Sequence, residues 1–169
     1  ILAPEFTEEA RAIFGQKPNI RLLKIPEIMK KPAGTMDLKR VPGGLLLQET
    51  DEALCGPLEL KTTTGLSEEQ REDLIFAWKV VKHVKSNAIV IAKDKQTLAV
   101  GPGQTSRIWA LQNALRNTVH DTKDAVMASD AFFPFRDCVD QAAQAGITAI
   151  IQPGGSQKDQ ESIDACNEQ

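Results

Sequence analysis

Two stretches of the sequence combine glycines with the start of a predicted helix, and this combination suits the binding of an anion. The first is Gly-Pro-Gly-Gln-Thr-Ser-Arg at residues 101–107, and the second is Pro-Gly-Gly-Ser-Gln at residues 153–157. Glycines let a backbone approach a ligand closely, and the free N–H groups of a helix start favour negative charge. Arg107 adds a planar, permanently charged group that fits phosphate or carboxylate. Neither stretch matches the Walker or dinucleotide fingerprint, so two tight turns closed by serine caps remain an equal alternative.

The sequence Ser-Asp-Ala-Phe-Phe-Pro-Phe-Arg-Asp at residues 129–137 crowds three of the chain's six phenylalanines into four positions. Aromatic rings gain little in an open loop unless they bury against something. A flat conjugated ligand offers such a surface, and its amide-like groups need polar partners nearby. Alternatively, the rings belong to the core and Asp137 only caps the next helix. Both interpretations stay open at this point.

Asn87 opens a predicted strand directly after a helix, where its side-chain amide either binds a ligand or closes the turn. Lys82 and His83 stand side by side at the end of that helix. Adjacent helical residues point about 100° apart, and the helix dipole favours basic side chains at this end in any case. We therefore do not favour a catalytic pair here, and we expect His120, beside Asp121 in a polar turn, to be solvated.

The elements that position these residues are predicted from capping signals and apolar periodicity. Helices are predicted from Thr7 to about Phe14, from the capping box of Ser67 and Gln70 onward, behind Ser106, from Asp137 to Gly146, and from Ser156 to about Asn167. Strands are predicted at residues 20–25, 44–48, 87–92, 97–100, 125–128 and 147–152, with mostly loop at 26–43. The alternation of strands and helices predicts an α/β domain whose sheet is covered on both faces, and the hairpin at 87–100 makes that sheet mixed.

The composition indicates one ordinary globular domain of 169 residues. The net charge is −3 and no long run has one sign, which argues against a nucleic-acid binder with a broad basic face. Three cysteines with no metal-ligand spacing indicate free thiols in a reducing compartment. No apolar stretch reaches the roughly 18 residues of a membrane span, so we expect a cytoplasmic protein without a membrane partner. The chain begins with Ile1 and not Met, which suggests an excised fragment.

Four segments together resemble one enzyme family in order and spacing. They are residues 76–90, Phe-Ala-Trp-Lys-Val-Val-Lys-His-Val-Lys-Ser-Asn-Ala-Ile-Val; residues 103–107, Gly-Gln-Thr-Ser-Arg; residues 129–137, quoted above; and residues 147–156, Ile-Thr-Ala-Ile-Ile-Gln-Pro-Gly-Gly-Ser. They are similar to the transformylase part of the bifunctional purine-biosynthesis family, the aminoimidazole carboxamide ribonucleotide (AICAR) formyltransferases and IMP cyclohydrolases. The similarity is strong from about residue 71 onward and looser at residues 15–65.

The resemblance implies a cytidine-deaminase-like three-layer α/β/α sandwich with a mixed sheet. This chain looks like the second, C-terminal subdomain of the transformylase region, truncated at both ends. The implied reaction moves a formyl group from 10-formyltetrahydrofolate to the 5-amino group of AICAR on the route to IMP, with an IMP cyclohydrolase elsewhere in the parent protein. A homodimer is implied, and no metal.

The resemblance also implies a role for particular residues. Asn87, Arg107 and Phe132 would bind the ribonucleotide, with Arg107 a candidate for its phosphate. Ile108, Asp137, Ser156 and Gln157 would contact the folate. No catalytic residue is expected here, because the family's Lys-His-Asn-Asn-Pro-Cys-Gly motif is missing, so the fragment alone should be inactive. The alternative is a non-catalytic nucleotide- or folate-binding module of the same fold. Zinc deamination is disfavoured because the chain has neither an H-x-E nor a P-C-x-x-C motif.

Overall fold

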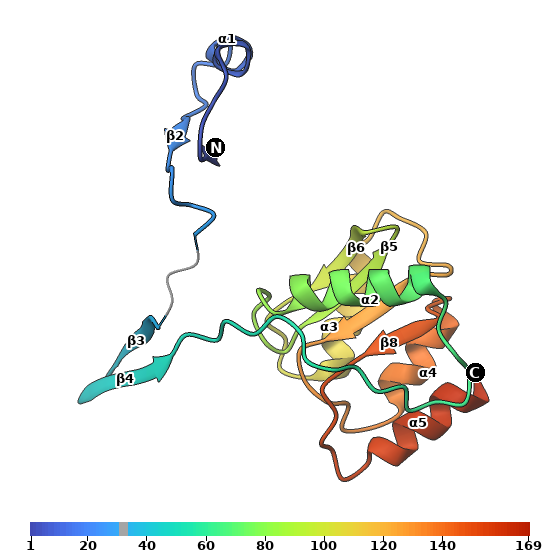
Figure 1. Cartoon of the computed structure of the whole chain (residues 1–169). Coiled ribbons are helices and arrows are strands. Elements are labelled where there is room, and N and C mark those ends of the chain that lie inside the picture. The colour runs from blue at the N-terminus through green and yellow to red at the C-terminus, as the bar shows by residue number, and fades with distance from the viewer. Residues whose placement is uncertain (31–33) are drawn as a thin grey trace. The chain divides into compact units, whose positions relative to one another are not determined.

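The computed structural model describes residues 1–30 and 34–169, and these fall into two compact units, Ile1–Glu52 and Ala53–Gln169. The second unit holds most of the regular structure (Figure 1). In chain order its elements are α2 (Glu68–Val81), β5 (Ile89–Lys93), β6 (Gln96–Gly101), α3 (Arg107–Asn117), β7 (Val126–Ser129), α4 (Asp137–Gln144), β8 (Ala149–Ile151) and α5 (Asp159–Glu168). No helix among the described residues is long and apolar enough to span a membrane.

The four strands of the second unit form one sheet in the order β6-β5-β7-β8. β5 runs antiparallel to both of its neighbours, whereas β7 and β8 are parallel. The predicted α/β domain with a mixed sheet is therefore confirmed. The predicted hairpin is also present, and its turn places Asp94 and Lys95 at positive φ, as the tight two-residue turn of a hairpin requires.

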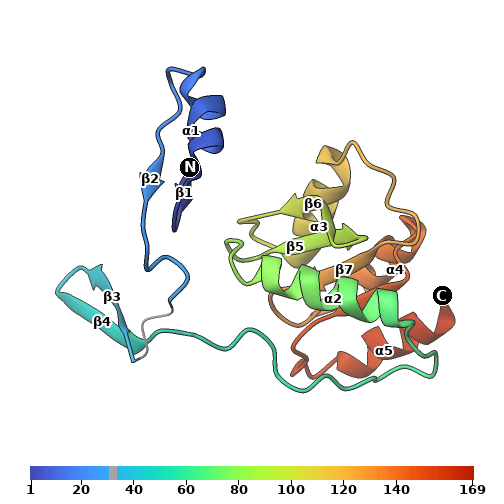
Figure 2. The same ribbon diagram turned by 45° about the horizontal axis from the view of Figure 1, so that its top comes forward.

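Helices cover both faces of this sheet, as the two views in Figures 1 and 2 show. Alternate residues of β5 point to opposite faces, so Ile89 and Ile91 join one apolar cluster while Val90 joins the other. The first cluster contains buried residues of α3, α4 and α5, and the second contains Leu74, Ala77 and Val81 of α2. The sheet is thus the middle of three layers.

Short-range signals in the sequence account for where the central helices begin. The predicted capping box is present, since Ser67 Oγ accepts from the Gln70 N–H at 3.1 Å and Gln70 Oε1 accepts from the Ser67 N–H at 3.0 Å. The start of α3 is fixed by packing as well as by its Ser106 cap. A Cβ on Gly101 would lie 1.9 Å from the Ala110 carbonyl oxygen, so only glycine lets α3 lie this close to β6.

Asp73 is a buried acid that no motif in the sequence marked. It lies on α2 and its side chain is 8% exposed. Its two carboxylate oxygens accept hydrogen bonds from the backbone N–H groups of Asp94 at 2.8 Å and Lys95 at 2.7 Å. The carboxylate therefore closes the turn of the β5–β6 hairpin and ties it to α2.

Two predicted helix starts are wrong in detail. Asp137 does not cap α4 but is its first residue, with Arg136 at the cap position and no side-chain cap bond. α5 begins at Asp159 behind Lys158, and not at Ser156. The Ser156 hydroxyl instead accepts from the Lys158 N–H at 3.1 Å, so it closes a turn before the helix. Gly154 and Gly155 adopt positive φ, so the helix cannot extend backward through them.

The first unit contains α1 (Glu8–Gly15) and two separate strand pairs, β1 (Leu2–Ala3) with β2 (Leu23–Lys24), and β3 (Met36–Val41) with β4 (Gly44–Glu49). The predicted helix and its Thr7 cap are confirmed, and Thr7 Oγ1 accepts from the Ala10 N–H at 3.2 Å. The strand predicted at 20–25 shrinks to two residues. The prediction of mostly loop at 26–43 is wrong from Met36 onward, because β3 pairs with the correctly predicted β4; residues 31–33 lie outside the described residues.

Candidate functional site at one edge of the sheet

The segments that carry the candidate residues meet at one edge of the four-stranded sheet. Ile89, at the start of β5, lies opposite Gly101 at the end of β6 and opposite Ser129 at the end of β7. β8 runs parallel to β7 and therefore ends at the same edge. Residues 86–88, 102–107, 130–137 and 152–158 all leave or enter the sheet here. The carboxyl ends of strands in open α/β sheets are the usual place for ligands.

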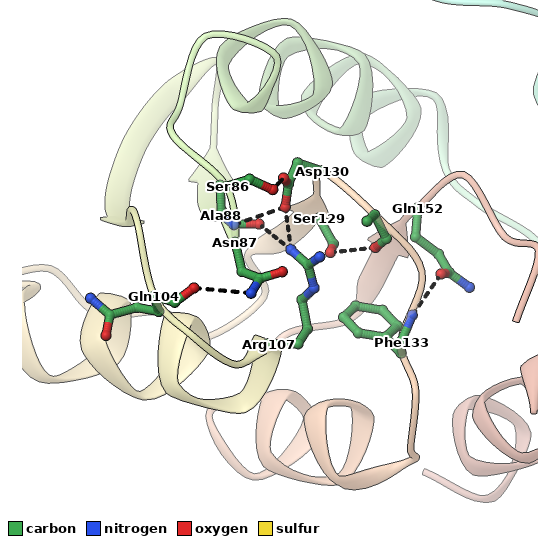
Figure 3. A network of polar contacts seen from close by, with 10 residues as sticks. Ser86, Asn87, Ala88, Gln104, Arg107, Ser129, Asp130, Phe133 and Gln152 are labelled. Carbon is green, nitrogen blue, oxygen red and sulfur yellow. Dashed lines mark hydrogen bonds and ion pairs between the residues drawn. The ribbon is translucent and has the colours of Figure 1, made fainter. Parts of the chain in front are cut away.

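The carboxylate of Asp130 joins three of these segments in a network of polar contacts (Figure 3). Its Oδ1 accepts from the Ala88 N–H at 2.8 Å and forms an ion pair with Nη1 of Arg107. Its Oδ2 accepts from the Ser86 hydroxyl. Burial raises the pKa of Asp130, but the hydrogen bonds from Ser86, the Ala88 N–H and Arg107 outweigh it, so the pKa lies below its ordinary value and the group stays ionised.

Arg107 is a buried cation that is only partly satisfied by its surroundings. Its residue is 7% exposed, and Nη1 also donates to the Ala88 carbonyl oxygen at 3.3 Å. Its Nε is buried and has no hydrogen-bond partner among the described residues. An unpaired buried donor next to a charge is costly, and native proteins rarely keep one without a ligand or water. The edge of the guanidinium that carries Nε is therefore suited to receive an acceptor oxygen.

The side chain of Asn87 closes a turn and still keeps an acceptor available. Its Nδ2 donates to the Gln104 carbonyl oxygen at 2.9 Å, and the two backbones exchange hydrogen bonds at 3.2 and 3.3 Å. No described residue donates to its Oδ1.

A depression of about 240 Å³ adjoins this turn and is lined by Gln104, Trp109, Gln112, Asn113 and Arg116. A second one, of about 610 Å³, surrounds only the β3–β4 turn at residues 40–45.

The phenylalanine-rich segment divides its rings between the core and the surface. Phe133 is buried at 1% exposure, and its N–H donates to Gln152 Oε1 at 3.1 Å. Phe132 and Phe135 are exposed, at 42% and 54%. The Nζ of Lys158 lies 4.9 Å from the centre of the Phe135 ring. The core interpretation thus holds for Phe133, while ligand stacking on the two exposed rings stays a prediction. The loops that follow β7 and β8 contact each other.

The charges of Asp137 and Arg107 both act on one buried thiol, Cys138. Asp137 is exposed at the start of α4, and its Oδ1 accepts from the Cys138 N–H at 2.8 Å. Burial raises the pKa of the Cys138 thiol to about 12, and the negative charge of Asp137 acts in the same direction. The positive charge of Arg107 acts on the same thiol in the opposite direction. The structure therefore brings Asn87, Arg107 and Asp137 to one region of the sheet edge.

The other predicted folate residues are placed less directly. Ile108 is half-buried and packs against the apolar cluster beneath α3. Ser156 and Gln157 lie on the loop behind β8, where Ser156 is half-buried and Gln157 is exposed. No hydrogen bond joins either of them to Arg107 within the described part of the chain. They are linked to the phenylalanine-rich loop only through their neighbours Gln152 and Lys158.

Asp130 and Ser86 are the site residues that the sequence did not identify, although Asp130 stood in a quoted motif. The available signal was an acid placed directly behind a strand of small apolar residues, on the edge where Arg107 was also expected. Across residues 1–30 and 34–169 no group of three or more histidine, cysteine or acidic side chains could hold a metal ion.

Comparison with known proteins assigns the family. The profile of the family described as AICARFT/IMPCHase bienzyme matches residues 1–117. Proteins named bifunctional purine biosynthesis protein PurH are similar along 99% of the chain, with 59% identity in Acetivibrio thermocellus and 54% in Caldicellulosiruptor bescii. The chain spans about a third, 33%, of the length of these relatives. This chain belongs to the AICARFT/IMPCHase bienzyme family.

Proposed function

We propose that this chain forms one wall of an AICAR formyltransferase site in a longer bifunctional enzyme. The whole protein would transfer the formyl group of 10-formyltetrahydrofolate to the 5-amino group of AICAR, and would carry its IMP cyclohydrolase activity outside this chain. The membership of the family and the names of the relatives support this proposal. No metal takes part in the proposed transfer.

The observation that carries the proposal is the buried Nε of Arg107, a charged donor without a partner among the described residues. A ribonucleotide carries a phosphate, and two of its oxygens can accept two parallel N–H bonds from one side of a guanidinium. Asn87 lies at the same edge of the sheet and has an amide oxygen that can accept from a hydroxyl or amino group. Phe132 is exposed on the segment that follows Asp130, and its ring would stack on the imidazole carboxamide.

The folate would occupy the neighbouring part of the edge. Asp137 is exposed, and a carboxylate there can accept two parallel hydrogen bonds from the amino-pyrimidine edge of a pterin. Ile108, Ser156 and Gln157 would complete the contacts with this co-substrate. The contact between Phe135 and Lys158 supports this arrangement, because it links the loop that leads to Asp137 with the loop that bears Ser156.

The chemistry of the proposed formyl transfer defines the role of the residues in this chain. The 5-amino group is a poor nucleophile, since its lone pair is delocalised into the imidazole and the carboxamide. Catalysis must remove its proton during attack and stabilise the tetrahedral oxyanion. The residues of this chain would bind and orient the two substrates, which by itself contributes much to such a rate. We assign the proton-transfer groups to the longer protein and none to residues 1–169.

The fold and the setting follow from the same proposal. We infer that the chain is the second, C-terminal subdomain of the transformylase region and has a cytidine-deaminase-like sandwich. The sheet with α2 on one face and α3, α4 and α5 on the other supports this. We also propose a cytoplasmic homodimer. The three free cysteines fit a reducing compartment.

The proposal is tested with the full-length protein and an Arg107→Gln variant. We expect the unaltered enzyme to formylate AICAR. In the variant, kcat/KM for AICAR should fall on the order of 10²-fold or more, because the phosphate of the substrate loses the buried guanidinium that would bind it. The cyclohydrolase activity of the same preparation should stay unchanged, which controls for folding. Absence of AICAR formylation by the unaltered enzyme, or an unchanged kcat/KM in Arg107→Gln, contradicts the proposal.

A further inference from the structure

We propose that Asp130 is the positioning residue of this site. It holds Arg107 and the segment that carries Asn87 in one arrangement, and it reserves the Nε side of the guanidinium for an oxyanion of the substrate. This inference rests on the proposed function for the identity of the substrate, but not for the geometry. It adds to the binding set a residue that need not contact any ligand.

Asn87 lies in the chain between two partners of Asp130, Ser86 and Ala88. The Ser86 hydroxyl and the Ala88 N–H both donate to this carboxylate, one to each oxygen. The residues on either side of Asn87 are therefore fixed to the segment behind β7. The Asp130 N–H adds a hydrogen bond of 3.3 Å to the Ala88 carbonyl oxygen. Asn87 is held from both sides without contacting Asp130 itself.

The nitrogens of the Arg107 guanidinium differ in whether they have a partner. A guanidinium has five N–H donors in a rigid planar fork. Both recorded contacts of Arg107, with Asp130 and with the Ala88 carbonyl, use Nη1. The pairing therefore fixes the plane of the fork from one corner and leaves Nε without a partner among the described residues. Two parallel donors on the remaining side match two oxygens of one phosphate.

The partners of Asp130 require a carboxylate at this position. Three donors converge on Asp130: a hydroxyl, a backbone N–H and a guanidinium. A carboxylate only accepts, so it satisfies all three, and its charge offsets the buried cation. An amide keeps the shape but loses the charge, and its nitrogen has to face one of the donors. The Ser86 hydroxyl can reverse and accept from that nitrogen, so Asp130→Asn should fold.

The matched control is Asp124→Asn. Asp124 and Asp130 flank the two ends of β7, and each forms an ion pair, Asp124 with Lys93 at 3.8 Å. Asp124 is exposed and lies at positive φ, which asparagine also adopts readily. The same substitution at this end of the strand removes an ion pair without touching the network of Asp130. It should leave all kinetic constants unchanged within about twofold.

The experiment measures KM and kcat for AICAR, and KM for the folate, in full-length variants. We expect KM for AICAR to rise on the order of tenfold in Asp130→Asn and more in Asp130→Ala, since a charge-assisted hydrogen bond is lost. The folate KM should change less than twofold. Ser86→Ala, which removes one neutral donor, should raise KM for AICAR by about threefold. Equal changes in both KM values would indicate a general structural role and overturn the proposal.

A double-mutant cycle separates positioning from stability. If Asp130 acts through Arg107, Asp130→Asn should add less than twofold to the effect of Arg107→Gln, whereas additive effects overturn the proposal. Binding of ribose 5-phosphate, measured by calorimetry, gives the same cycle without catalysis. It decides the matter even if the unaltered enzyme does not formylate AICAR. In that case the proposed function fails, while coupled loss of phosphate binding still supports the role of Asp130.

Discussion

The two units of the chain differ in whether they have a core. In Ala53–Gln169 two apolar clusters fill the space between a sheet and the helices on its faces. In Ile1–Glu52 no described residue is buried, and Leu38, Leu45 and Leu47 of the β3–β4 pair are 60–68% exposed. A sheet of several strands packed on helices can support itself, whereas a two-stranded ribbon in water is marginal at best.

A packed core decides where binding residues can be held accurately. Every candidate residue lies in the unit with the core, on segments whose ends are fixed by strands β5, β6, β7 and β8. The first unit has local order only, such as its capped helix and a regular hairpin register. The following predictions test this contrast with pairs of similar substitutions, one in each unit where the chain offers them.

The largest effect on stability is expected from Gly101→Ala. The new Cβ would overlap the Ala110 carbonyl oxygen, 1.9 Å away, so α3 must move from the sheet. We expect a loss of about 3 kcal/mol or more in the free energy of unfolding. Gly44→Ala is the matched substitution in β4, where nothing lies within 4 Å of a Cβ, and it should change stability by less than about 0.5 kcal/mol. Urea denaturation of residues 1–169 measures both, and equal effects would break the comparison.

The next effect concerns leucines. Leu111 on α3 is fully buried, and Leu111→Ala should cost about 2–5 kcal/mol because it removes apolar contacts and leaves a cavity. Leu47 on β4 is 60% exposed, and Leu47→Ala should cost less than about 0.5 kcal/mol. Thermal unfolding of the two variants gives the difference. A large loss at Leu47 would show that the β3–β4 pair is covered in solution.

A smaller effect is expected for the buried carboxylate of Asp73. Asp73→Ala leaves the N–H groups of Asp94 and Lys95 without their acceptor, which should cost about 1–3 kcal/mol. Exposed Asp37 of β3 serves as the control, and Asp37→Ala should be nearly neutral. Hydrogen exchange at the Lys95 amide should become faster only in the Asp73 variant. Unchanged protection of that amide would show that the turn closes without the carboxylate.

The smallest effect is on thiol chemistry. Burial raises the pKa of Cys138 to about 12, so it should resist alkylation at pH 8 while exposed Cys55 reacts. The unfolded thiol ionises near its ordinary pKa of 9.0, but the folded one keeps its proton up to about 12. The folded state thus binds more protons in this window, and stability should fall as the pH rises above 9. A Cys138→Ala variant should lose this part of the pH dependence, and a mass spectrum shows which thiol is labelled.

The sequence predicted the second unit well because burial leaves a periodic pattern. The capping box of Ser67, the stripe on α2 and the β5–β6 hairpin all follow from local rules. β3 was missed because the prolines and glycines of residues 26–43 favoured a loop, although Met36 to Lys39 alternates apolar and polar residues. The start of α5 was misplaced because the hydroxyl of Ser156 looks like a cap whether it serves a helix or a turn.

The candidate site could also be predicted only in part from the sequence. Arg107 and Asn87 could be named from local motifs, but their meeting with Asp130 depends on β5 lying antiparallel between β6 and β7. That order of strands is a long-range property, and no short motif encodes it. Asp130 therefore looked like one polar residue among several, although it accepts from Ser86, Ala88 and Arg107 at once.

The antiparallel placement of β5 has a practical consequence for labelling. All the candidate segments leave the sheet at one rim. At the opposite rim the structure describes the turn at Asp94 and Lys95, the segment around Lys123 and the connection at residues 145–148. A fluorophore or a surface tether attached to a cysteine introduced at Lys123 would sit at the far end of β7 from Asp130. Such a probe could report on the folding or immobilisation of the protein while leaving the ligand side open.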